Sequence, residues 1–369
     1  MRVAVYAICK NEAQFAKRFV ESCTGADAIV IADTGSDDGS PELLRGLGAS
    51  VFDVVISPWR FDDARNAALA LVPADIDVCV SLDMDEVLQP GWRDALDAAW
   101  TAEATRARFT TVYSRNHDGT PGIVFTNDRI HARHGYRWKH ACHEGLYPDR
   151  IAETFVHAAG LQVDHYPDPS KDRSNYLDLL ERAVAEEPHS PRMAHYLARE
   201  YFFVGRHREA IAEFERYLSF ANNYYTDERG ASMIYIAKCL AALGEDAEPW
   251  FHRAIGESPS RREPWINLAE LLYLRSDWPG CYAAAVRGLS IPPGGSGYMS
   301  DPHCSGATPD DLAAIAAWNL GLHAAALIHA RAALTFAPDD ARLQDNLTLI
   351  ENGKETAQSV RYPVASPRG

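Results

Sequence analysis

Short apolar runs alternate with helix-like segments over residues 1–168, and this alternation constrains the fold more than any other feature of the chain. The runs rich in Val and Ile predict strands, and the segments with apolar residues at helical spacing predict helices. The predicted strands are 2–8, 28–33, 50–56 and 77–82, and the predicted helices are 11–23, 40–48 and 62–72. Strands that alternate with helices form mostly parallel sheets flanked by helices. We therefore expect an α/β domain built on a mostly parallel sheet.

Polar residues follow three of the predicted strands. Lys10, Asn11 and Glu12 follow the first strand, "DTGSDDGS" begins at Asp33 where the second ends, and "DMDE" begins at Asp83 just after the fourth. In open α/β sheets, ligands bind at the carboxyl ends of the strands. These clusters therefore predict one site at one edge of the sheet.

The acids of "DMDE" raise a question of charge, because Asp83, Asp85 and Glu86 stand within four positions behind an apolar run. Neighbouring carboxylates repel one another and are costly to desolvate. Two interpretations remain open on the residues alone. The acids form a solvated turn, or they bind something positive, for which a divalent cation with a preference for oxygen ligands is suited.

Composition limits the partners. The 369 residues carry a formal net charge of −15, which disfavours attraction of the whole surface to nucleic acid or anionic lipid. No apolar stretch is long enough to span a membrane, and the start "MRVAVYAICKNEA" is interpreted as a buried strand and not as a signal peptide. The seven cysteines are scattered without a CxxC pair, which favours free thiols and a cytoplasmic location.

The remainder of the chain predicts an all-α domain over residues 175–355, followed by a flexible tail at 356–369. Four stretches each carry an apolar helix, a Gly or polar turn, and a second helix with small residues. They span 192–220, 231–259, 263–293 and 311–340. This pattern resembles the tetratricopeptide repeat, although the spacing is irregular and a glycine-rich insertion precedes the last stretch. Stacked helix pairs give an extended surface suited to a large partner.

The motifs of the α/β domain, taken in order, resemble those of family-2 glycosyltransferases of the GT-A fold. The chain opens with "YAICKNEAQF", continues with "VIADTGSDDGSPELL", and places "ARN" before the "DMD" motif. The resemblance is close over about residues 1–100 and looser to about residue 170. It implies a Rossmann-like α/β fold and transfer of a hexose from a nucleotide diphosphate sugar, most simply a UDP-sugar, with Mn²⁺ or Mg²⁺ as cofactor.

The resemblance also implies roles for single residues. Asp85 is expected to hold the metal, with Asp83 nearer the ribose of the donor. Asp33 is expected to accept from the base, and Arg65 to pair with the base or a phosphate. Asn11 and Glu12 either meet the nucleotide or cap the first helix, and those alternatives stay open.

Downstream of residue 130 the resemblance is to the Trp and His-Glu stretch of lipopolysaccharide-core and sublancin-type S-glycosyltransferases. There His165, or alternatively His143, is expected to complete the metal site. An inverting transfer requires a general base. Glu144 is the first candidate for that base and Asp164 the second, because the Glu-Asp pair common in the family is missing at this place.

The helical repeats favour a macromolecular acceptor, either a protein or peptide or a lipopolysaccharide core. An alternative acceptor is a modified base of phage-type DNA, which the cluster of arginines and aromatics near residue 133 would suit and the net charge disfavours. Two other classes of protein fit the sequence less well. A binding scaffold with a degenerate transferase domain is disfavoured by the intact motifs. A nucleotidyltransferase is disfavoured because no glycine follows the first strand.

Overall fold

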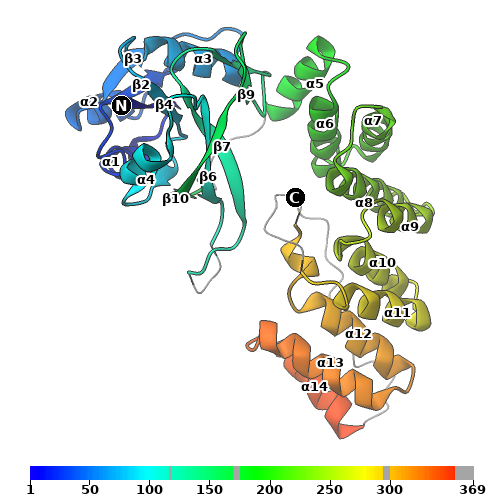
Figure 1. The fold of residues 1–369 in the computed structure, drawn as a ribbon. Coiled ribbons are helices and arrows are strands. Elements are labelled where there is room, and N and C mark those ends of the chain that lie inside the picture. Colours follow the sequence, from blue (N-terminus) through cyan, green and yellow to red (C-terminus); the bar gives the residue numbers. More distant parts are fainter. Residues whose placement is uncertain (116–118, 169–174, 294–299, 354–369) are drawn as a thin grey trace. The chain divides into compact units, whose positions relative to one another are not determined.

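The computed structural model describes residues 1–115, 119–168, 175–293 and 300–353 (Figure 1). The chain divides into two compact units, Met1–Glu186 and Glu187–Gly369. The tail predicted for 356–369 and part of the glycine-rich insertion, 294–299, lie outside the described residues. No helix in the described part of the chain is both long and apolar enough to cross a membrane. The seven cysteines are all free and buried.

The first unit is built on an eight-stranded sheet with the order β3-β2-β1-β4-β7-β6-β10-β5. A separate ribbon pairs β8 with β9. The strands are β1 (Val3–Cys9), β2 (Ala28–Asp33), β3 (Ser50–Asp53), β4 (Val78–Ser81), β5 (Glu86–Leu88), β6 (Arg106–Val112), β7 (Val124–Ala132), β8 (Tyr136–Lys139), β9 (Gly145–Pro148) and β10 (Phe155–His165). The four predicted strands are thus present as β1 to β4.

The expectation of a mostly parallel sheet is correct for only half of it. Strands β3, β2, β1 and β4 are parallel neighbours. Beyond β4 the sheet is mixed, because β7 is antiparallel to both β4 and β6, and β5 is antiparallel to β10. Strands β6 and β7 are joined by a hairpin, which needs no crossover helix. The result is a Rossmann-like parallel half extended by a mixed half.

Helices cover both faces of this sheet. Val3, Val5 and Ala7 of β1 pack in one core with α1, α2 and α4, whereas Ala4 and Tyr6 pack in another with α3 and the β8–β9 ribbon. Alternate residues of a strand point to opposite faces, so a strand buried on both sides is apolar throughout. The helices are α1 (Ala13–Ser22), α2 (Ser40–Gly46), α3 (Phe61–Leu71), α4 (Trp92–Ala99) and α5 (Tyr176–Glu186).

A buried chain of polar groups links β1, β7 and β8. Trp138 Nε1 donates to Tyr6 Oη at 2.8 Å, Tyr6 Oη lies 2.9 Å from His131 Nε2, and His131 Nδ1 lies 2.8 Å from the carbonyl oxygen of Ala132. A carbonyl only accepts, so Nδ1 carries the proton and Nε2 accepts from the tyrosine. Burial lowers the pKa of His131 to about 3, so this histidine is neutral.

The second unit is a series of helix hairpins, as the repeats predict. The four predicted pairs are α6 with α7, α8 with α9, α10 with α11 and α12 with α13, each pair in contact. Figure 1 shows them stacked in chain order. The elements are α6 (Pro191–Phe203), α7 (His207–Ser219), α8 (Thr226–Ala242), α9 (Glu248–Glu257), α10 (Glu263–Leu274), α11 (Trp278–Leu289), η1 (Pro302–Cys304), α12 (Thr308–Asn319), α13 (His323–Phe336) and α14 (Ala341–Asn352).

Glycine closes the turn inside three of these hairpins. Gly205, Gly244 and Gly321 each have φ between 73° and 77°, a conformation that other residues adopt only with strain. The last helix, α14, was not predicted as part of a pair. It packs on α13 through buried Leu343 and Ile350 and so covers the last hairpin.

Candidate active site

The loops after β1 and β2 lie side by side, because these strands are parallel neighbours in the sheet. The backbone N–H of Asn11 donates to Ser36 Oγ at 2.8 Å, and the N–H of Asp37 donates to Asn11 Oδ1 at 2.9 Å. Glu12 is buried at the start of α1, and its N–H donates to Ser40 Oγ at 2.9 Å. Asn11 and Glu12 therefore join the two loops at the predicted edge of the sheet.

Asp33 shapes the loop that follows it. Its Oδ2 accepts from the backbone N–H groups of Gly35 and Ser36, each at 3.0 Å, and its Oδ1 accepts from the Ser36 hydroxyl. The side chain is buried. Asp33 is expected to accept from the base of the nucleotide sugar. It would do so with a carboxylate that already accepts three hydrogen bonds within the protein.

Asp83 lies between two arginines. Its Oδ1 accepts from Arg65 Nη2 at 2.6 Å, and its Oδ2 accepts from Arg129 Nη1 at 3.1 Å. Burial opposes ionisation, but the two guanidinium groups hold the pKa of Asp83 well below its usual range. Arg129 also pairs with Glu86, whose carboxylate accepts the backbone N–H of Asp83 at 2.8 Å. The first acid of "DMD" is thus fixed in its charged form.

Arg65 connects Asp83 to the predicted base. On α3, its guanidinium is buried over the ring of Trp138, 4.9 Å from the centroid, and its Nε donates to Glu144 Oε1. Burial alone would lower the pKa of Arg65, but Asp83 and Glu144 raise it, so the side chain stays charged. Arg65 was expected to pair with the donor, and the structure instead shows it bridging two carboxylates of the protein.

Asp85 lies beside His165, the last residue of β10. His165 Nε2 is 3.5 Å from Asp85 Oδ2, and His165 Nδ1 is 3.1 Å from the carbonyl oxygen of Tyr113. Because Nδ1 faces an acceptor, it carries the proton of the neutral ring. Nε2 then directs a lone pair at a carboxylate, an arrangement that needs a positive partner. That partner is a second proton or a metal ion.

The two side chains fit a divalent cation. At a metal–ligand distance of about 2.1 Å, two adjacent ligands of one ion lie about 3 Å apart, close to the separation seen here. Within the described residues no group of three or more His, Cys, Asp and Glu side chains has the geometry of a metal site. Asp85 and His165 would therefore leave most positions on the ion open to a substrate or water.

The other predicted residues divide between the site and its surroundings. Glu144 reaches the site through Arg65. Asp164 lies on the opposite face of β10 from His165, is buried, and pairs with Arg115 and Gln162. His143 packs edge-on against the ring of Tyr176, with 6.0 Å between the ring centroids. The structure thus brings His165 to Asp85 and places His143 against α5.

Two side chains that contact the candidate site were not predicted from the sequence. Arg129 stands in the sequence only as part of a basic and aromatic cluster, yet it pairs with both Asp83 and Glu86. Tyr113 stacks on His165 with 4.6 Å between ring centroids and an interplanar angle of 14°. Both lie in the β6–β7 region, which carries no motif. The sequence carries no signal that pairs Arg129 with Asp83, because the two residues stand 46 positions apart.

Comparison with known proteins finds a family model that matches part of the first unit. The family model described as Glycosyl transferase family 2 matches residues 4–138. Among solved structures, half of the chain is similar to yeast Tom70, at 15% identity and a TM-score of 0.38, and it covers 37% of that chain. The chain is also similar to TTC0263, a thermophilic TPR protein of Thermus thermophilus, at 18% identity and a TM-score of 0.35, covering 48% of this chain and 89% of that one.

Proposed function

We propose that this chain, whose residues 4–138 form a glycosyltransferase domain of family 2, is a metal-dependent, inverting hexosyltransferase that uses a nucleotide diphosphate sugar, most simply a UDP-sugar. The observation that carries the proposal is the Asp85–His165 pair, which faces the carboxyl edge of the parallel strands beside an Asp83 held by two arginines. A cation with open coordination positions at this place would meet a diphosphate.

Asp85 and His165 would hold the cation, Mn²⁺ or Mg²⁺. A bound cation offsets the negative charge that builds on the leaving diphosphate. Asp83 cannot lend either oxygen to the metal without weakening an ion pair, since Arg65 takes one and Arg129 the other. We therefore assign Asp83 to the ribose of the donor, where a fixed, charged acceptor suits a hydroxyl group.

Asn11, Glu12 and Asp33 form the donor side of the site. Their loops are joined by hydrogen bonds, so the walls of the nucleotide site are fixed before a donor arrives. Such pre-organisation lowers the entropy lost on binding. Arg65 acts indirectly, by orienting Asp83 and Glu144 and not by meeting the donor.

Glu144 is assigned as the general base that takes the proton of the attacking acceptor group. The guanidinium of Arg65 lies between Glu144 and Asp83 and pairs with both. Glu144 is mostly buried, with 11% of its side chain exposed. Asp164 is the weaker candidate, because it lies on the other face of its strand and is paired with Arg115. A base must be within hydrogen-bond reach of the proton that it abstracts.

The acceptor is assigned as a macromolecule that docks on the helix hairpins, a protein or a lipopolysaccharide core, in the cytoplasm. The net charge of −15 disfavours DNA. A scaffold with a degenerate transferase domain is the second candidate, and the ion-paired arrangement of Asp83, Arg65 and Glu144 argues against it. Uncompensated drift would have left at least one buried charge without its partner.

A thermal-shift screen tests the donor site. UDP-, GDP-, dTDP- and CMP-sugars are added with and without Mn²⁺, and the best donor is repeated on Asp85→Asn. A ligand that binds only the folded state raises the melting temperature. We expect a metal-dependent shift for one nucleotide, lost in Asp85→Asn. If no donor shifts the melting temperature at millimolar concentration with metal present, the scaffold alternative is favoured.

A further inference from the structure

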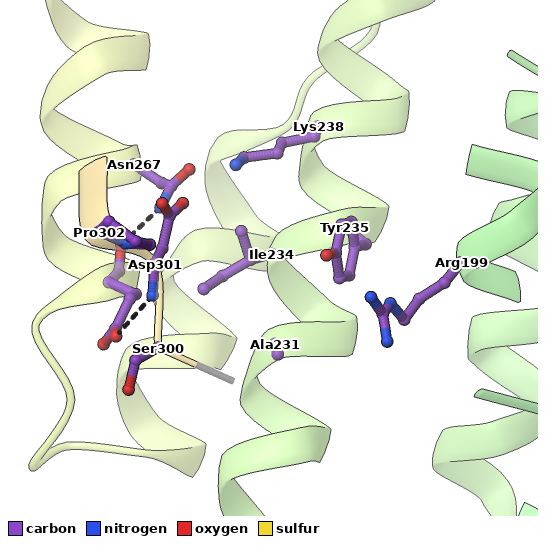
Figure 2. Close-up of a pocket in the computed structure, with 10 residues that line it drawn as sticks. Arg199, Ala231, Ile234, Tyr235, Lys238, Asn267, Ser300, Asp301 and Pro302 are labelled. Carbon is purple, nitrogen blue, oxygen red and sulfur yellow. Dashed lines mark hydrogen bonds between the residues drawn. The ribbon is translucent and has the colours of Figure 1, made fainter. Parts of the chain in front are cut away.

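The helical unit contains a pocket of about 280 Å³ (Figure 2). Its walls come from the first helices of three successive hairpins, α6, α8 and α10, and from the segment Ser300–Pro302 ahead of η1. Ligand pockets in proteins typically begin at about 300 Å³. At about 280 Å³ this pocket lies just below that range, so its size suits one side chain of a larger partner better than a whole small molecule.

Helix α8 supplies most of the apolar wall. Ala231, Ile234, Tyr235 and Lys238 have the spacing i, i+3, i+4 and i+7, which places them on one face of the helix. In Figure 2, Ile234 and Lys238 point from α8 toward α10 and the Ser300–Pro302 segment, whereas Tyr235 lies on the side of Arg199. There the ring of Tyr235 stacks on Phe214 of α7, with 5.3 Å between the ring centroids. The wall is therefore a small apolar surface that ends in an amino group.

The charges in the pocket are not balanced by its own residues. Both carboxylate oxygens of Glu263 accept from Arg261, at 2.7 Å and 3.1 Å. Asp301 accepts the N–H of His303 as the cap of η1. By contrast, neither Arg199 nor Lys238 has an ion pair within the described residues, and Arg199 Nε is buried without a hydrogen-bond partner among them.

Two cations without counter-ions in a partly apolar pocket need an anion. An unsatisfied buried N–H group costs free energy, and a bound acceptor would recover it. Figure 2 places Arg199 across the pocket from Asp301, so an anion held at Arg199 would avoid that acid. Asp301 is the one acid of the lining that has no cationic partner among the described residues. Its charge reduces the net positive charge of the pocket but does not make the pocket negative.

We infer that this pocket binds a carboxylate of an acidic peptide segment in a partner protein. This inference rests on the proposed function, since it names the acceptor or its docking segment as an acidic polypeptide. The apolar wall of Ile234 and Tyr235 favours a peptide over a free inorganic anion, which would use only the two cations. The pocket lining holds two cations, Arg199 and Lys238, which suits a single carboxylate better than the repeated phosphates of a nucleic acid strand.

Fluorescence anisotropy with the full chain tests the inference, without any nucleotide sugar. The probe is a rhodamine-labelled peptide of alternating Glu and Leu, and its control has Gln in place of Glu. We expect the acidic peptide to bind at least about tenfold more tightly than the Gln peptide, and Arg199→Glu and Lys238→Glu each to weaken it about tenfold. Asp301→Asn keeps a residue that caps helices but removes the opposing charge, so it should strengthen binding.

Arg253→Glu is the matched control, because it makes the same charge change on α9 at a residue outside the pocket lining. The inference is overturned if Arg253→Glu weakens binding as much as Lys238→Glu, or if the Gln peptide binds equally well. It is also overturned if inorganic phosphate at equal ionic strength displaces the peptide completely, because that result would indicate a site for small anions. Tighter binding of a single-stranded oligonucleotide than of the acidic peptide would overturn it as well.

The pocket variants should keep the donor-dependent thermal shift. A wild-type protein with no such shift would contradict the proposed function and leave the peptide result standing.

Discussion

Glu144 and Asp83 share a partner, because Arg65 donates to both carboxylates. The ion pair with arginine orients the carboxylate of Glu144, and a general base must be held within reach of the proton that it takes. The same guanidinium therefore fixes the acceptor side and the donor side of the candidate site. Lysine could not replace it, because a single ammonium group lacks the planar fork that serves two carboxylates.

Glu144→Gln should lower turnover by about 100-fold or more while leaving donor binding unchanged, because Gln keeps the acceptor oxygen for Arg65 but cannot take a proton. Turnover is measured as release of the nucleoside diphosphate, and donor binding as the thermal shift. Glu153→Gln is the control, since Glu153 pairs with Arg106 at 2.9 Å elsewhere in the same unit. Turnover within about twofold of wild type would reject Glu144 as the base.

His131 makes stability depend on pH. Its folded pKa of about 3 lies below the value of an unfolded histidine, so the unfolded state binds more protons between these two pKa values. Stability then falls as pH is lowered through about 6.5 toward 3, and the loss from about pH 7 to pH 5 is about 2 kcal/mol.

His131→Gln should remove that loss, since Gln can accept from Tyr6 Oη but does not titrate. Urea unfolding of both proteins at about pH 7 and pH 5, followed by circular dichroism, gives the difference. Other titrating groups, such as His165, are present in both proteins and cancel. Equal loss of stability in wild type and variant would show that His131 is not the titrating group.

Residue roles could be predicted only where a motif marks them. Asp33, Asp83 and Asp85 stand in short motifs at strand ends. Arg65 stands in the "ARN" motif on α3 and reaches the same edge through its ion pair with Asp83. Arg129 could not be placed, because its partner Asp83 is 46 positions away in the sequence and only the β4–β7 pairing brings them together. The pairing of Arg65 with Glu144 could not be predicted for the same reason, since Glu144 lies 79 positions from Arg65 in the sequence.

At the scale of elements, the connection between β6 and β7 supports His165. The carbonyl of Tyr113 fixes the proton on His165 Nδ1, and the ring of Tyr113 stacks on the imidazole. Arg115 of the same connection pairs with Asp164, the neighbour of His165 in β10. A segment without any motif thus orients the residue that would bind the metal.

Tyr113→Ala should weaken binding of Mn²⁺ about tenfold in the presence of the nucleoside diphosphate, and Tyr113→Phe should not, because Phe keeps the stacking ring. The backbone carbonyl remains in both variants, so the comparison isolates the ring. Isothermal titration calorimetry gives the affinity directly and does not depend on turnover. If Tyr113→Ala binds the ion as tightly as wild type, the ring does not position His165.

Elements with local signals were predictable, and those fixed by distant pairing were not. The strands β1 to β4 and the eight helices of the hairpins follow from periodicity and Gly turns. The insertion of β7 between β4 and β6 follows from pairing across about 50 residues of chain, which periodicity does not record. Helix α14 lay inside the predicted helical domain, but only its burial against α13 identifies it as a cover.

At the scale of the whole molecule, the two units have separate cores, with Met1–Glu186 and Glu187–Gly369 each compact by itself. This separation suggests a division of labour in which the first unit holds the donor and the second selects the acceptor. The division is testable, because each function has its own readout. It also distinguishes a transferase with a docking array from a scaffold with a degenerate domain.

A chain that ends at Glu186 should keep the metal-dependent thermal shift with the donor, since every residue assigned to the donor site lies before that point. Its transfer to a macromolecular acceptor should fall about tenfold or more relative to the full chain, because local concentration at the docking surface is lost. Hydrolysis of the donor by water, which needs no docking, serves as the control and should stay within about twofold of the full chain. If transfer to the macromolecule survives the truncation, the helix hairpins do not present the acceptor. If instead the shorter chain folds but no longer binds donor, the first unit depends on the second, and the division of labour is wrong.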